Sequence, residues 1–124
     1  MAKRKSMIET NNKEVEPKYV TYPVRIKVIS QKGTCVFCHK VGDEWIYKYE
    51  PGKKPETPDI CDGALHTMLL YLKPLWWGAP IPFPMRDPDA LSVACPDPDN
   101  TVVFELKRLK EQPIHFQLGD KIFS

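Results

Sequence analysis

Apolar and charged residues alternate from Val24 to Val28. An alternation with a period of two is typical of a β-strand that buries one face. We therefore predict a strand that begins at Tyr22-Pro23 and ends in a turn at Gly33.

Three further segments have the character of strands. The aromatic run 45–47 (Trp-Ile-Tyr) follows a Gly42-Asp43 turn. Residues 91–95 and 102–106 alternate again, and the Pro-Asp-Pro-Asp-Asn stretch at 96–100 between them has the composition of a turn. The pattern thus predicts an antiparallel sheet of short strands.

One segment has helical periodicity. Asp62 is a candidate N-cap, and Pro74 is expected to end the helix, which we place at 64–72. The apolar positions fall on one helical face that would pack on the sheet: Leu65, Met68, Leu69 and Leu72. The predicted fold class is α+β, with a small antiparallel sheet, one short helix on a face, proline-rich loops and a cysteine-rich metal site.

Composition limits the number of domains and the kind of partner. A chain of 124 residues, 42% of them hydrophobic, suits one domain, and 13 prolines argue against a helical bundle. We predict a polar, partner-bound tail at 1–21, a single metal-binding α+β domain at 22–110 and a C-terminal extension at 111–124. No apolar run approaches the length of a membrane span. A net charge of +2 does not favour nucleic-acid binding.

The N-terminus has the basic start of a signal peptide without an apolar stretch after it. We therefore expect a cytoplasmic protein. In a reducing compartment, cysteines are more often metal ligands or reactive thiols than disulfides.

The four cysteines are the main candidates for chemistry. Cys35 and Cys38 form a Cys-x-x-Cys pair, which is one half of a typical structural zinc site. Cys61 directly precedes the predicted helix, where backbone amides favour a thiolate, and Cys95 ends a strand. We predict a zinc site made of these four cysteines, or of three of them with His39.

Other interpretations of the cysteines stay open. Cys61 and Cys95 could be ordinary buried residues, or Cys35 and Cys38 could form a redox dithiol. The Cys-x-x-Cys-His pattern also matches haem attachment, but that needs export, so we expect no haem. No phosphate-binding loop is present, and no nucleotide is expected.

A catalytic metal would need an open position and a nearby acid or base. His66, Asp97 and Asp43 are candidates, although both aspartates also suit turns. A metal-dependent enzyme that uses His66 or Asp97 is therefore the alternative to a structural site.

The aromatic and proline-rich stretch after the helix is a candidate partner-binding segment. Two adjacent tryptophans do not both point inward easily, and exposed aromatics beside prolines anchor partners well. The residues concerned are Trp76, Trp77, Pro80, Pro82 and Phe83.

Three motifs together resemble a family of small uncharacterised prokaryotic proteins over Tyr22 to Leu109. They are the run Cys35-x-x-Cys38-His39-Lys-Val-Gly-Asp, Cys61 before Ala-Leu-His, and Cys95-Pro-Asp. In that family the position of Cys38 is often glycine. The resemblance therefore implies a site of Cys35, His39, Cys61 and Cys95, and implies no particular activity.

These observations lead to an expected function. We expect a small zinc-binding accessory or structural subunit of a larger multi-subunit enzyme complex, such as a carboxylase of anaerobic metabolism. A stand-alone metal enzyme and a cysteine-based redox protein are the alternatives.

Overall fold

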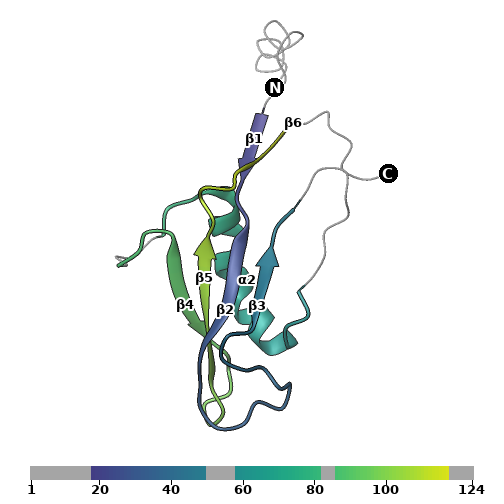
Figure 1. Cartoon of the computed structure of the whole chain (residues 1–124), viewed down its shortest axis with the longest axis vertical. Coiled ribbons are helices and arrows are strands. Elements are labelled where there is room, and N and C mark those ends of the chain that lie inside the picture. The colour runs from purple at the N-terminus through teal and green to yellow at the C-terminus, as the bar shows by residue number, and fades with distance from the viewer. Residues whose placement is uncertain (1–17, 50–57, 82–85, 118–124) are drawn as a thin grey trace, which may run out of the picture.

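A computed structural model describes residues 18–49, 58–81 and 86–117. Their order is six strands with one helix between the third and fourth (Figure 1). The elements are β1 (Lys18–Thr21), β2 (Val24–Gln31), β3 (Glu44–Tyr47), α2 (Asp62–Trp77), β4 (Ala90–Ala94), β5 (Val102–Arg108) and β6 (Ile114–Gln117).

The main sheet has the order β3-β2-β5-β4, and each neighbouring pair is antiparallel. The alternation that predicted β2 and β5 is confirmed in their register, where Ile26 lies opposite Leu106 and Val28 opposite Phe104. One helix and two antiparallel sheets make the α+β class correct.

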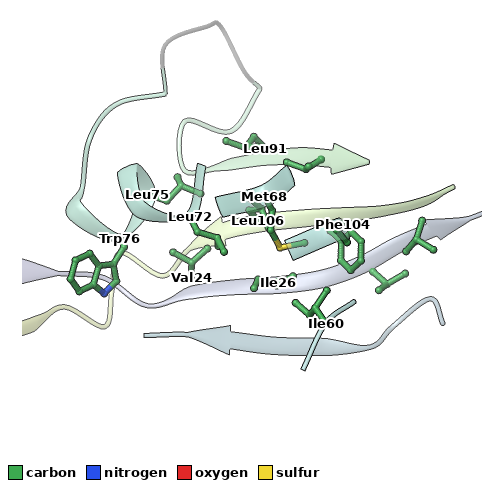
Figure 2. Packing of buried hydrophobic residues seen from close by; sticks show 14 residues of the cluster. Val24, Ile26, Ile60, Met68, Leu72, Leu75, Trp76, Leu91, Phe104 and Leu106 are labelled. Atoms are coloured by element: carbon green, nitrogen blue, oxygen red, sulfur yellow. The ribbon is translucent and has the colours of Figure 1, made fainter. Parts of the chain in front are cut away.

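The core lies between one face of this sheet and α2 (Figure 2). Apolar side chains of β2 and β5 meet those of the helix because strand positions alternate and helix positions repeat every three or four residues. The fully buried residues include Phe104, Ile26, Met68, Leu72, Leu75 and Leu106. The opposite face of the sheet carries charged pairs such as Arg25 with Glu105, 3.3 Å apart.

The helix is longer than the expected 64–72. It begins at Asp62 and ends at Trp77, with Cys61 rather than Asp62 in the N-cap position and with Pro74 inside it. Proline removes the hydrogen bond to the carbonyl four residues earlier, that of Leu70. Leu70 is 75% exposed, on the side of the helix where water can replace that bond. Burial of Leu75 and Trp76 holds the last turn.

Gly78 ends the helix in a left-handed conformation, with φ of 83°. Its N–H donates to Leu75 O, and the N–H of Ala79 donates to Pro74 O, so two of the carbonyls left free at the helix end are used. A Cβ at Gly78 would lie 3.0 Å from the ring of Tyr22. Helix termination here therefore depends on glycine.

Gly78→Ala is expected to lower the free energy of unfolding by about 1–2 kcal/mol, which is the cost of a left-handed non-glycine residue. A urea titration followed by tryptophan fluorescence measures it. Gly42→Ala is the comparison: Gly42 also has positive φ (100°) but has no atom within 4 Å of the added methyl, so this variant should show the conformational cost alone and Gly78→Ala should lose more stability. An unchanged midpoint for Gly78→Ala would contradict this account of the helix end.

β1 and β6, the first and last described strands, form a second sheet of their own. Residues 18–21 were assigned to the polar tail and 114–117 to the extension, but they pair as β1 and β6. Figure 1 shows this ribbon leaving the main sheet at the end opposite the β2–β3 loop. It is tied to the helix, because Tyr22 N–H donates to Trp76 O and the rings of Tyr19 and Trp77 lie edge to face. Residues 1–17 of the predicted tail lie outside the described residues.

No helix in the described part of the chain is long and apolar enough to cross a membrane.

Candidate metal centre

The β2–β3 loop carries Cys35 and Cys38. A tight turn joins them, because the N–H of Cys38 donates to Cys35 O at 2.9 Å. The turn leaves Cys38 with φ of 64°, a conformation that glycine adopts at much lower cost. Cys38 is exposed and Cys35 is half-buried.

The same loop is held against the β4–β5 turn. The side-chain oxygen of Asn100 accepts the N–H of Thr34 at 2.9 Å. Gly33 makes this approach possible, because a Cβ there would lie 2.3 Å from the same oxygen. The segment with Cys35 is therefore fixed beside the turn that follows Cys95.

Cys61 is placed by a buried histidine. His39 is 7% exposed, and its Nε2 accepts the backbone N–H of Cys61 at 3.2 Å. The imidazole ring lies edge-on to Trp45 and Phe104, with ring centres 5.4 and 6.0 Å apart. His39 thus joins the β2–β3 loop to the start of α2, and the thiol of Cys61 stands at the helix N-terminus.

Cys95 directly follows β4 and is held by a backbone amide. Its Sγ accepts the N–H of Val102 at 3.3 Å across the β4–β5 turn. The thiol also donates to Asn100 O at 3.9 Å, so both contacts hold Cys95 against the β4–β5 turn.

Three of the four cysteines line a single pocket of about 170 Å³, which lies where the β2–β3 loop, the start of α2 and the β4–β5 turn meet. Cys35 comes from the β2–β3 loop, Cys61 from the residue before α2 and Cys95 from the end of β4. The other lining residues are Val36, Phe37, Asp62, Gly63, Pro96, Asp97 and Asn100. Cys38 and His39 do not line it, although His39 contacts Cys61 from the core side.

The four cysteines are free thiols. Within residues 18–49, 58–81 and 86–117, no three His, Cys, Asp or Glu side chains are gathered closely enough to hold a metal ion. The backbone therefore brings three thiols to one pocket, and their side chains would have to turn toward an ion to bind it.

Asp97 lines this pocket and also organises the β4–β5 turn. Its Oδ1 accepts the backbone N–H groups of Asp99 and Asn100, and its Oδ2 accepts the side-chain amide of Asn100. The N–H groups of Asn100 and Asp99 lower the pKa of the Asp97 carboxyl. The carboxylate is therefore part of the scaffold that holds Asn100 against the β2–β3 loop.

This pKa shift predicts a pH dependence. Because the folded pKa lies below the unfolded value of about 3.9, the stabilisation is complete above that pH and is lost as pH falls through the folded pKa. Asp97→Asn is expected to flatten the decline of stability below about pH 4. Urea titrations at a series of pH values test this, with Asp99→Asn in the same turn as the control for net charge. An identical acid profile for Asp97→Asn and the parent would contradict the assignment.

The other predicted site residues lie elsewhere. His66 is exposed and lies in a separate surface hollow with Thr67, Leu69, Leu70 and Tyr71. Asp43 accepts the N–H of Lys40 and shapes the loop before β3.

The candidate partner-binding segment is divided between helix and loop. Trp76 and Trp77 are the last residues of α2 rather than part of an extended loop. Trp76 is buried and Trp77 is 51% exposed, so one of the two is presented at the surface, as expected. Pro80 is exposed, whereas Pro82 and Phe83 lie outside the described residues.

Sequence reasoning missed two residues that shape the pocket. Asn100 was grouped with the turn, and nothing in the sequence indicated that its side chain reaches the β2–β3 loop. Gly63 lines the pocket at the start of α2, and a Cβ there would lie 3.4 Å from Pro96, an ordinary van der Waals distance, so this end of the helix packs beside the β4–β5 turn.

No family model matches the chain, and no curated protein or solved structure is significantly similar to it.

Proposed function

We propose that this chain is a zinc-binding protein in which Cys35, Cys61 and Cys95 hold the ion. The observation that supports this proposal is that three of its four cysteines, from three separate segments, line one pocket. Free cysteines are often buried singly as small apolar residues. Convergence of three of them on one surface pocket would let them bind one ion after their side chains turn toward it.

Two of the three proposed ligands lie beside backbone amides. Cys61 occupies the N-cap position of α2. The amide of Val102 donates to the sulfur of Cys95. Thiolate sites select zinc, copper(I) and iron–sulfur clusters, and zinc is the usual ion of structural sites built from cysteines.

A bound metal would stabilise the end of the main sheet where the β2–β3 loop and the β4–β5 turn lie. At this end the β2–β3 loop and the β4–β5 turn are joined by hydrogen bonds, such as the one that the N–H of Thr34 donates to the side-chain oxygen of Asn100. An ion bound by Cys35, Cys61 and Cys95 would add three bonds between the same segments. Such a site contributes free energy to folding directly.

We further propose that the protein is an accessory subunit of a larger complex. Large apolar side chains are exposed at two places: the β2–β3 loop carries Val36, Phe37 and Val41, and α2 carries Leu70 and Trp77. Exposed apolar groups of this size suit contact with other chains.

Native mass spectrometry of the protein isolated from its own source tests both parts. We expect a mass increase of one zinc per chain and co-purification of a larger companion, whose sequence would identify the chemistry of the complex. A metal-free chain whose cysteines are all alkylated at the rate of an unfolded control would contradict the zinc proposal. A zinc-bound chain without a companion would contradict the accessory role alone.

A further inference from the structure

Cys35 and Cys38 lie at the two ends of one tight turn. The N–H of Cys38 donates to Cys35 O at 2.9 Å, so these four residues form a hydrogen-bonded turn. Such a turn keeps its first and last Cα atoms within about 7 Å, and a disulfide joins Cα atoms about 4.4–6.8 Å apart. The backbone therefore already holds the two cysteines within reach of a disulfide bond.

Side-chain contacts hold this turn in place. In the orientation that satisfies both of its polar atoms, the amide of Gln31 accepts the N–H of Cys35 at 3.3 Å and donates to His39 O at 2.9 Å. The N–H of Thr34 donates to the side-chain oxygen of Asn100. A bond between the ends of so short and ordered a segment costs little chain entropy.

Cys38 is the more accessible cysteine of the pair. It is exposed, whereas Cys35 is half-buried and lines the pocket. The residues between them, Val36 and Phe37, are 83% and 58% exposed, so the described part of the chain leaves the turn uncovered. A small oxidant in solution therefore reaches Cys38 first, and Cys35 lies in the same turn to react next.

The other two cysteines belong to separate segments. Cys61 occupies the N-cap position of α2. The sulfur of Cys95 accepts the N–H of Val102 at 3.3 Å and donates to Asn100 O at 3.9 Å. A disulfide within the turn leaves these contacts intact, whereas a disulfide between Cys35 and Cys95 would break them.

We propose that Cys35 and Cys38 form a reversible disulfide, with oxidised glutathione or a similar small disulfide as the oxidant. The sulfur of Cys38 loses its proton, attacks one sulfur of the oxidant and displaces one glutathione, which takes up a proton. The sulfur of Cys35 then loses its proton, attacks that of Cys38 and displaces the second glutathione, which takes up the other proton. The two cysteines lose two electrons, and the oxidant is reduced to two thiols.

Oxidation of the turn changes the pocket, because it removes the Cys35 thiol from the three that line it. One consequence rests on the proposed zinc site, whereas the disulfide itself does not. If zinc is held by Cys35, Cys61 and Cys95, the oxidised chain keeps only two of its three thiol ligands. Zinc binding would then depend on the redox state of the turn.

Tryptic peptides of the full chain distinguish the possible disulfides. Cleavage after lysine and arginine, but not before proline, puts the cysteines on three peptides: 33–40 with Cys35 and Cys38, 54–86 with Cys61, and 87–107 with Cys95. The chain is equilibrated with glutathione, its remaining thiols are alkylated, and the peptides are weighed. In oxidised glutathione alone we expect nearly all of peptide 33–40 to lose two hydrogen atoms and to take up no alkylating reagent.

Reversal and two variants are the controls. Dithiothreitol should restore both thiols of peptide 33–40. Cys61→Ser should oxidise as the parent does, whereas Cys38→Ser should give no oxidised form of this peptide. Three results would each overturn the proposal: a glutathione adduct on Cys38 that does not close, a cross-link from peptide 33–40 to another peptide, or thiols that stay reduced in oxidised glutathione.

The effect on zinc is measured separately, by urea unfolding. Zinc should raise the midpoint of the reduced chain and leave that of the oxidised chain unchanged. Equal stabilisation of both forms would show that the disulfide does not act on the zinc site. If zinc stabilises neither form, the proposed function fails, and the mass of peptide 33–40 still decides whether the disulfide forms.

Discussion

Phe104→Ala is expected to lower the free energy of unfolding by about 3–5 kcal/mol, the usual cost of truncating a large aromatic residue in a core. Phe104 is fully buried on β5 and lies opposite Val28 in the sheet. Its ring packs against those of His39 and Trp45, with centres 6.0 and 6.3 Å apart. The cavity left by alanine would therefore open directly beneath the histidine that supports Cys61.

Urea unfolding with an unchanged denaturant slope measures this effect. Phe104→Leu is the volume-conserving comparison and should cost less than alanine, since it refills most of the cavity. Val103→Ala, next to it on the charged face of the sheet, should cost much less because Val103 is only partly buried. Equal losses for Phe104→Ala and Val103→Ala would show that the core does not lie on this face.

The main sheet could be predicted because its strands bury one face and leave the other in water. In β5, for example, Phe104 and Leu106 are buried while Glu105 is half-buried and paired with Arg25 across the sheet. Alternation of this kind is a local property and is visible in the sequence. The class and most of the sheet follow from it.

The pairing of β1 with β6, which lie far apart in the sequence, cannot be seen in a local pattern of this kind. Residues 114–117 alternate over only four positions and residues 18–21 do not alternate clearly, and each segment is a strand because it pairs with the other. The end of α2 was misplaced for a related reason. Pro74 is an ordinary stop signal, but burial of Leu75 and Trp76 against the core outweighs the one hydrogen bond that proline removes.

The candidate site was predictable as a set of residue types but not as an arrangement. The sequence identified four cysteines and a histidine, and could not separate Cys35 from Cys38. That separation depends on the left-handed backbone of Cys38, which the turn imposes.

Cys61→Ala is expected to abolish zinc-dependent stabilisation of the fold. A ligand that binds only the native state at 1,000 times its dissociation constant adds about 4 kcal/mol, and a site with one thiolate fewer would lose most of this. The substitution perturbs the helix little by itself, since the side chain of Cys61 makes no capping hydrogen bond. Comparison of urea unfolding with zinc and with a chelator, for parent and variant, isolates the contribution of the metal from that of packing.

Two further variants separate the stabilisation that comes from zinc from the stabilisation that comes from helix capping. Cys61→Ser should also lose the zinc effect, yet its chelated form should be more stable than that of Cys61→Ala by about 1 kcal/mol, because serine is a favoured N-cap residue and alanine is not. Cys38→Ser should keep the zinc effect in full, since Cys38 stands outside the pocket wall. If zinc stabilises Cys61→Ala as much as the parent, Cys61 is not a ligand. If Cys38→Ser loses the zinc effect instead, the ion is held at the Cys-x-x-Cys turn and not in the three-cysteine pocket.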